Sequence, residues 1–288
     1  MKIFYSPEML GPPQSRSPSA HKPQAVVESW LAIAPQLEII APQPVSVAQL
    51  CLAHSLEYVA DVLAGRASNG FGNRSLELAA SLPYTSGSML SAARAAMADG
   101  TVAVAPCAGF HHAMYAFAAD FCTFNGLVVT ARALLQDGVA TRVGILDADM
   151  HYGDGTDEIL EAVGETRVVH YSVGEHYWHP KDAAGYFDQL PTILAGFADC
   201  DVLLYQAGAD PHIDDPLGGW LTTEQLRERD RSVFEFCAAR RLPIAWNLAG
   251  GYQQPLRRVL DIHDNTLLEC LRVYEPKTVA KRPTHQFS

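Results

Sequence analysis

The stretch Arg142-Val-Gly-Ile-Leu-Asp-Ala-Asp-Met-His-Tyr-Gly-Asp-Gly-Thr156 decides the fold. It opens as an apolar, β-branched run, which predicts a buried strand. Asp147, Asp149 and His151 then occupy alternate positions, so in an extended backbone their side chains point to one side. Carboxylate and imidazole ligands suit Zn²⁺ or a similar divalent metal. A polar loop of hydrogen-bonded aspartates is the alternative, and the stretch alone does not decide between the two.

Two glycines close this stretch and predict a turn into a helix. Gly153 and Gly155 allow the backbone to bend sharply. Asp154 or Thr156 is expected to cap the helix that follows.

Composition limits the class of protein. The 288 residues are 48% hydrophobic and 18% charged, which suffices for one large α/β domain with a substantial core. The formal charge of −11 argues against nonspecific nucleic-acid binding. No apolar run is long enough to span a bilayer, and the first residues do not form a signal peptide. The six cysteines are dispersed without a CxxC pair, which is typical of reduced thiols in a cytoplasmic protein.

Predicted strands alternate with predicted helices along the chain. Strands are expected at residues 2–6 (an edge or entry strand), 37–40, 101–105, 142–147, 168–172, 201–206 and 243–248. Helices are expected at 23–34, 47–64, 75–99 with a break near Pro83, 121–137, 154–163, 190–197, 223–241 and 255–273, and a long loop at 7–23. This alternation predicts a three-layer α/β/α fold with a mainly parallel sheet. We expect a single domain over residues 1–274 and a polar tail at 275–288.

Polar residues follow the carboxyl ends of five predicted strands. They are His111-His112, Asp147 to Asp154, Ser172, Asp210, and Gly250-Gly-Tyr252. In open α/β sheets, ligands bind in the crevice at those ends. Five separate segments pointing to the same edge are stronger evidence for a site than any one of them.

A metal site can be built from these segments. Asp149 and His151 supply two ligands, and Asp210, on a loop that Gly208 allows to approach closely, is the natural third. Three protein ligands leave a position for water and substrate, as catalytic zinc requires. Taken alone, Asp210 could equally be a helix cap or a turn residue.

Catalytic groups surround this predicted metal. The tandem pair His111-His112 can supply a general base and a general acid, although such a pair in isolation is most often an accident of surface or core. Asp147 and Asp154 are available to orient the two imidazoles. Tyr252, on a glycine-flanked turn, could donate a hydrogen bond to an oxyanion.

Together these residues resemble the histone deacetylase superfamily, which includes bacterial acetylpolyamine amidohydrolases. The matching pieces are Gly109-Phe-His-His-Ala113, Phe121-Cys-Thr-Phe-Asn125, Asp147 to Thr156, Ala207-Gly-Ala-Asp-Pro-His212 with Asp215-Pro-Leu-Gly218, and Gly250-Gly-Tyr252. The resemblance implies an arginase/deacetylase-like fold and a catalytic Zn²⁺, or Fe²⁺ in the cell, held by Asp149, His151 and Asp210.

The resemblance also implies a role for each remaining site residue. His112 would be the main base and acid, paired with Asp154, and His111 its electrostatic partner, paired with Asp147. Tyr252 would polarise the amide carbonyl. The side chains of Asp147 and Ser172 would hold a structural K⁺. Phe121 would line one wall of the substrate tunnel. Gly250 and Asp120, the latter outside the family pattern, are our further candidates for substrate binding.

Three departures from the family pattern affect substrate recognition. Asp120 stands where the family usually has glycine, and a carboxylate there could select a cationic group or simply point away. Tyr152 stands where many members have a second histidine. The segment between Ser172 and Asp210 is short, so an aromatic residue, Tyr177, Trp178 or Phe187, is expected to replace the opposite tunnel wall.

The sequence therefore predicts a zinc-dependent amidohydrolase that deacylates a small N-acyl amine or an acylated lysine. Two alternatives stay open. One is an arginase-type ureohydrolase, which would need a two-metal ligand set. The other is a catalytically dead acyl-amine binding protein. Neither a nucleic acid nor a membrane is an expected partner, and whether the chain forms a homo-oligomer stays open.

Overall fold

The computed structural model describes residues 1–11 and 22–275, and its centre is one parallel sheet of seven strands. The strands are β1 (Lys2–Phe4), β2 (Glu38–Ile40), β3 (Val102–Ala105), β4 (Val143–Asp147), β5 (Val168–Ser172), β6 (Val202–Gln206) and β7 (Ile244–Asn247). Their order across the sheet is β2-β1-β3-β7-β6-β4-β5, and every pairing is parallel. The predicted three-layer α/β class is confirmed. The first strand is an interior strand, however, because β2 pairs with its free side.

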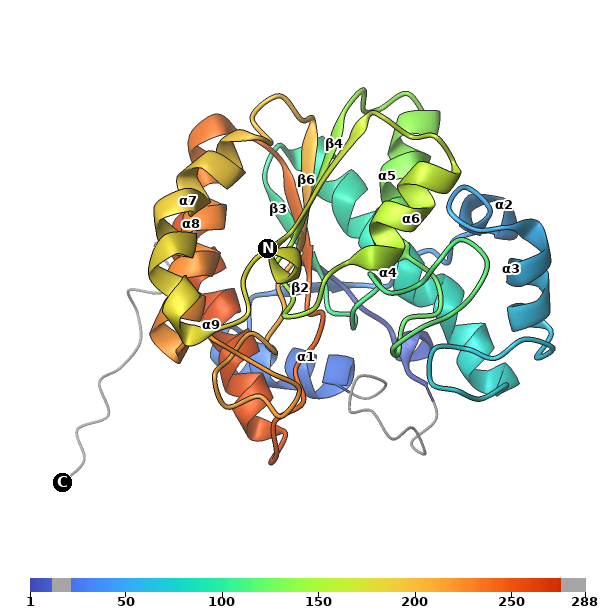
Figure 1. The fold of residues 1–288 in the computed structure, drawn as a ribbon, viewed down its shortest axis with the longest axis horizontal. Coiled ribbons are helices and arrows are strands. Elements are labelled where there is room, and N and C mark those ends of the chain that lie inside the picture. The colour runs from blue at the N-terminus through green and yellow to red at the C-terminus, as the bar shows by residue number, and fades with distance from the viewer. Residues whose placement is uncertain (12–21, 276–288) are drawn as a thin grey trace.

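Helices cover both faces of this sheet (Figure 1). They are α1 (Lys22–Ile33), α2 (Val47–Leu50), α3 (Leu56–Leu63), α4 (Leu76–Asp99), α5 (Gly126–Gln136), α6 (Asp154–Ala162), α7 (Ala183–Ala195), α8 (Thr223–Arg240) and α9 (Arg257–Tyr274), with short 3₁₀ turns at Pro7–Met9, Val173–Glu175 and Pro180–Asp182. Helices α1, α7, α8 and α9 pack on one face, and α2 to α6 pack on the other.

Alternation along the strands divides the core in two. Leu146 and Trp246 point into the core under α1, α7, α8 and α9, whereas Ile145 and Ala245 point into the other core. All four side chains are inaccessible to solvent. Because successive side chains of a strand face opposite sides of the sheet, each of these strands contributes apolar side chains to both cores.

The register of the ladder brings the polar strand ends level. Asp147, the last residue of β4, pairs with Ser172 of β5 on one side and with Gln206 of β6 on the other. Gln206 in turn pairs with Asn247 of β7. The segments after these strands therefore leave the sheet at one edge, as expected for the site.

Three predicted helix boundaries are wrong. Helix α4 runs without interruption through Pro83. Its extensive packing against α5 and β3 outweighs the one backbone hydrogen bond that proline removes. Helix α5 begins only at Gly126, since Asp120 and Phe121 adopt left-handed φ angles of 40° and 66°. Helix α7 begins at Ala183 instead of residue 190, and its buried face includes Tyr186.

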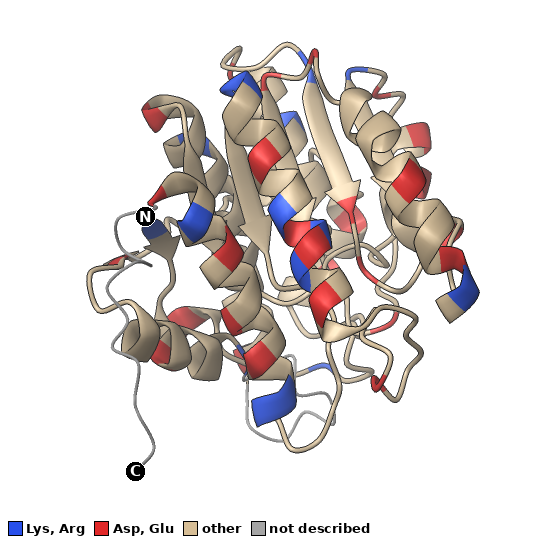
Figure 2. Ribbon diagram, turned by 90° about the vertical axis from the view of Figure 1, so that its left-hand side faces the viewer, with Lys and Arg blue, Asp and Glu red and all other residues tan. Residues whose placement is uncertain are grey.

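The surface carries charges of both signs. Acidic and basic residues interleave along the helices of the α7–α8 side, without one large basic patch (Figure 2). Within residues 1–11 and 22–275 there is no helix with the length and apolar character needed to cross a bilayer. Most of the loop expected at 7–23, and the tail after residue 275, lie outside the described residues.

Candidate functional site

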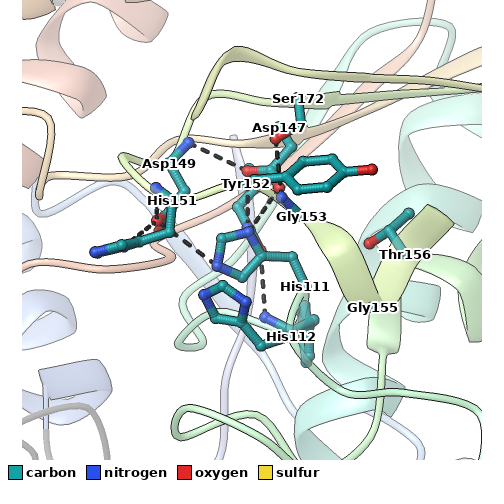
Figure 3. Close-up of polar contacts among 12 residues, drawn as sticks. His111, His112, Asp147, Asp149, His151, Tyr152, Gly153, Gly155, Thr156 and Ser172 are labelled. Carbon is teal, nitrogen blue, oxygen red and sulfur yellow. Dashed lines mark hydrogen bonds and ion pairs between the residues drawn. The ribbon is translucent and has the colours of Figure 1, made fainter. Parts of the chain in front are cut away.

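Asp149, His151 and Asp210 meet at the carboxyl edge of the sheet (Figure 3 shows the first two). Each offers one potential ligand atom, and the three atoms lie within 4.8 Å of one another. His151 Nδ1 is 3.2 Å from Asp149 Oδ1 and 3.3 Å from Asp210 Oδ2. The segments after β4 and β6 thus bring together the three residues predicted to hold the metal.

The chemistry of this cluster fits a divalent cation. Asp149 and Asp210 are both buried, and Asp210 Oδ2 has no hydrogen-bond partner although it is closed off from water. Burial, and then the charge of Asp149, raise the pKa of Asp210. Two buried carboxylates this close are costly unless a cation joins them, and two oxygens with one imidazole nitrogen match zinc's usual ligands.

Two histidine–aspartate pairs lie beside these candidate ligands, and Figure 3 labels both histidines and Asp147. His111 Nδ1 is 2.7 Å from Asp147 Oδ2, and His112 Nδ1 is 2.8 Å from Asp154 Oδ1. The two imidazole rings are 4.0 Å apart at their centroids. The N-cap of α6 is Gly153, so the predicted position of the cap is wrong, although Asp154 Oδ1 also accepts a hydrogen bond from the first-turn amide of Gly155 at 2.9 Å.

The two imidazoles have opposite pKa shifts. Burial alone would lower the pKa of His111, but the carboxylates of Asp147 and Asp149 outweigh it and raise that pKa to about 9. Burial and the neighbouring His111 lower the pKa of His112, with Asp154 opposing them in part. With these shifts, His111 is charged and His112 neutral near pH 7, so a proton acceptor would be available beside a fixed positive charge.

The carboxylate of Asp147 makes further hydrogen bonds besides the one to His111. Its Oδ1 accepts hydrogen bonds from the Asp149 amide (3.1 Å) and from Gln206 Nε2 (2.9 Å). Across the ladder, Ser172 Oγ accepts a bond from the Gly153 amide at 2.9 Å. A structural K⁺ between Asp147 and Ser172 stays a prediction.

A cavity of about 270 Å³ reaches two of the three candidate metal ligands, Asp149 and His151. Its walls include both histidines of the tandem pair, with Asp120, Phe121 and Tyr252. The rings of Phe121 and Tyr252 are 6.0 Å apart at their centroids. Burial, then the charges of Asp210 and Asp149, raise the pKa of Tyr252, which therefore keeps its hydroxyl proton and can donate it in a hydrogen bond.

Gly250 contacts both candidate carboxylate ligands and also lines the cavity. Its amide donates to Asp149 Oδ2 at 2.9 Å. A Cβ atom added to it would lie 2.1 Å from Asp210 Oδ2. Only glycine therefore lets the backbone after β7 pass against both carboxylates.

The predicted aromatic replacement of the opposite wall is wrong. Tyr177 packs inward, with its ring stacked 5.8 Å from that of Trp220, and Trp178 is exposed with its indole bonded to Gly174. Neither residue, nor Phe187, lines the cavity, where Leu217 provides the apolar wall instead. Tyr177 and Phe187 instead pack against Tyr186 of α7, with ring centroids 5.2 Å and 5.1 Å away.

Lys22, at the start of α1, contacts the site although no sequence pattern singles it out. Its ammonium is fully buried and donates to the carbonyls of Ala249 (2.5 Å) and Gly250 (3.0 Å). Burial lowers the pKa of Lys22 to about 8, with Asp210 and Asp149 opposing. No motif marks this lysine, since it is 227 residues away from its first partner.

His54 is a buried histidine that holds the segment leading into α5. Its Nδ1 is 2.9 Å from the Met114 carbonyl, and its Nε2 accepts from the amide of Asn125, the residue that caps α5, at 2.8 Å. Burial lowers the pKa of His54 to about 4, so the ring is neutral.

The sequence of the chain matches a known family over this region. Residues 17–189 match the histone deacetylase domain. The chain belongs to the histone deacetylase family. Asp210 and Tyr252 lie beyond the matched residues, and the fold brings them to the site.

Relatives of this deacetylase-family chain resemble it over part of their length. An uncharacterised protein of Picosynechococcus sp. is 31% identical over 175 residues, which are 54% of this chain and 56% of that protein. The chain thus spans about half the length of the curated relatives it matches.

Solved structures share the fold over almost the whole chain. An acetylpolyamine aminohydrolase from Burkholderia pseudomallei superposes with a TM-score of 0.73 at 18% identity, covering 95% of this chain and 99% of that one. The HDA15 HD domain superposes with a TM-score of 0.75 at 20% identity, covering 97% and 98%. At these identities the likeness establishes the arginase/deacetylase-like fold.

Proposed function

We propose that this protein is a zinc-dependent amidohydrolase that removes the acyl group from an N-acylated amine of the acetylpolyamine or acetyl-lysine type. The observation that carries the proposal is the meeting of Asp149, His151 and Asp210 with two histidine–aspartate pairs at one cavity. A Zn²⁺ ion held by those three residues would polarise the acyl carbonyl and lower the pKa of water. Membership of the deacetylase family supports the same reaction class.

His112 is the proton carrier in this proposal. Its Nδ1–H is held by Asp154, which leaves Nε2 as a base on the cavity side. Nε2 takes a proton from water as the oxygen bonds to the acyl carbon. It then returns that proton to the amine nitrogen as the C–N bond breaks. The products are a carboxylic acid and a free amine.

His111 and Tyr252 stabilise the charges that develop. His111, protonated because Asp147 and Asp149 raise its pKa, stays beside His112 and favours transfer of the proton onward to the leaving amine. The hydroxyl of Tyr252 donates a hydrogen bond to the oxyanion that forms at the carbonyl oxygen. Structural K⁺ at Asp147 and Ser172 would fix the strand ends that carry these groups.

Asp120 is the proposed selector of the amine. Its side chain is exposed at the cavity lining, on the same wall as Phe121. A carboxylate at this mouth favours substrates with a second positive charge, such as acetylated polyamines.

The proposed location is the cytoplasm, and the six free cysteines agree with it.

An activity panel with metal analysis tests the proposal. Purified protein should hold about one zinc ion per chain and deacetylate acetylpolyamines or acetyl-lysine peptides. Tyr252→Phe should keep the metal and lose roughly 100- to 1,000-fold in kcat. His112→Ala should be at least as damaging. Wild-type protein that binds acyl amines without turnover would support the binding-protein alternative.

The ureohydrolase alternative makes a different demand. It needs a second metal with its own ligands, whereas within residues 1–11 and 22–275 one three-residue cluster meets the ligand geometry. Two bound metals per chain, with hydrolysis of a guanidinium substrate, would favour that alternative.

A further inference from the structure

Arg229 of α8 is a fully buried cation that the proposed chemistry does not use. Its side chain is 1% exposed. One nitrogen, Nη1, donates to the carbonyl of Ala148 and to the carbonyl of Gly208, both at 2.9 Å. Ala148 directly precedes Asp149, and Gly208 stands two residues before Asp210. A single nitrogen thus joins the two segments that carry the carboxylate metal ligands.

These two carbonyls need a partner because the ladder ends just before them. Asp147 and Gln206 are the last paired residues of β4 and β6, and one further bond joins the Ala148 amide to the Gln206 carbonyl. Beyond that point the segments leave the sheet. A buried carbonyl without a hydrogen-bond donor destabilises the fold. Arg229 supplies the N–H donor that a neighbouring strand would otherwise provide.

The guanidinium is held in a fixed direction by its own neighbours. Nε donates to Asp230 Oδ1 at 2.9 Å, and Nη2 lies 2.8 Å from the same oxygen. The hydroxyl of Tyr205 donates to that carboxylate, as does Thr266 Oγ1 at 2.6 Å. Asp230 therefore holds the planar fork in place, and Nη1 can point only toward the strand ends.

The backbone is closely packed at this junction. A Cβ atom on Gly208 would lie 2.7 Å from the Asp149 Cα atom. The amide of Met150 also donates to Asp210 Oδ1 at 3.2 Å. Moving either carbonyl away from Arg229 would therefore move a metal ligand with it.

We propose that Arg229 is a positioning residue that sets the spacing of Asp149 and Asp210 by joining the carbonyls of Ala148 and Gly208. The inference rests on the proposed metal site. A buried ion pair is a poor source of stability compared with apolar packing, so stability alone does not account for a guanidinium at this place. The spacing of the ligands accounts for it, because metal–ligand distances may vary by only a few tenths of an ångström.

The test measures zinc affinity by competition with a chelator in three proteins. Arg229→Lys keeps the charge, but a lysine cannot pair with Asp230 and also bridge both carbonyls. Its dissociation constant for zinc should rise roughly 10- to 100-fold. Thr266→Val is the matched control: it removes a hydrogen bond to Asp230 and leaves the bonds to Ala148 and Gly208. It should lower Tm while the zinc dissociation constant stays within about twofold of the wild type.

The outcomes separate the inference from the proposed function. A folded Arg229→Lys protein that binds zinc within twofold of the wild type overturns the positioning role. An equal loss of affinity in Thr266→Val also overturns it, since general loosening of the core would then explain both. Wild-type protein that binds no zinc overturns the metal site itself. Should Arg229→Lys fail to fold, Asp230→Asn keeps Arg229 but weakens its orientation, and unchanged zinc affinity in that variant refutes the inference.

Discussion

Replacing Gly250 by alanine should remove metal binding while leaving the sheet intact. The new Cβ would lie 2.1 Å from Asp210 Oδ2 and 2.9 Å from Asp149 Oδ2. Carbon and oxygen atoms that are not bonded normally stay more than ~3 Å apart, so something must move by about 1 Å. The neighbour in the way is a buried carboxylate whose backbone is held on both sides, so the ligand itself has to shift.

The size of the loss follows from that shift. Metal–ligand distances tolerate only about 0.2 Å, so a displacement of about 1 Å amounts to losing a ligand. We expect zinc affinity to fall by at least ~100-fold, the upper end of what changes beside metal ligands cause. Hydrolysis should fall with it, because the carbonyl would no longer be polarised.

Zinc titration monitored by calorimetry measures this loss, with Gly109→Ala as the matched control. Gly109 lines the same cavity, but a Cβ there meets no atom closer than 3.6 Å. The control should bind zinc like the wild type. If Gly250→Ala also binds zinc within threefold of the wild type, the carboxylates next to Gly250 are not the ligands.

Three further predictions concern residues around the centre. Lys22→Met leaves the carbonyls of Ala249 and Gly250 without their donor, so kcat should fall roughly tenfold with most zinc retained, measured as turnover per bound metal. The pKa of His54 is about 4 in the folded protein and 6.5 in the unfolded chain, so the neutral ring stabilises the fold fully above about pH 6.5. This contribution, up to about 3 kcal/mol, is lost as the pH falls toward 4. The free energy of unfolding of His54→Gln, measured in urea, should lack that pH dependence. Asp120→Asn should reduce kcat/KM for an acetylated diamine more than for a neutral analogue of equal length, and equal effects would show that Asp120 is not a selector.

The sequence predicted the parts of the site that depend on strand periodicity. Asp147, Asp149 and His151 alternate after an apolar run, and a parallel sheet brings the ends of its strands to one edge. The position of Asp210 followed from the same argument applied to another strand. These residues could be placed because local backbone geometry fixes their direction.

Residues that reach the site through tertiary packing could not be found in this way. Arg229 lies in the run Glu228-Arg-Asp-Arg231 of a helix whose sequence is typical of an exposed, charged surface. Lys22 stands at the start of another helix and belongs to no recognisable motif. In both cases the partner is a backbone carbonyl, which leaves no trace in the sequence. The start of α5 was missed for a related reason, because Phe121 adopts a left-handed φ that its residue type does not suggest.

The negative charge of the buried carboxylates accounts for a buried lysine at this site. Four carboxylates are buried in or near the site: Asp147, Asp149, Asp210 and Asp215. Lys22 and a protonated His111 supply two positive charges among them, while Arg229 is already paired with Asp230. A divalent cation would supply the two that remain. Lys22 also holds the loop before Tyr252, and the metal would hold the ends of β4 and β6. The same contacts therefore neutralise the carboxylates and position the reacting groups. Removing Lys22, the charge on His111 or the metal should change the geometry of the site at a smaller cost than unfolding the protein.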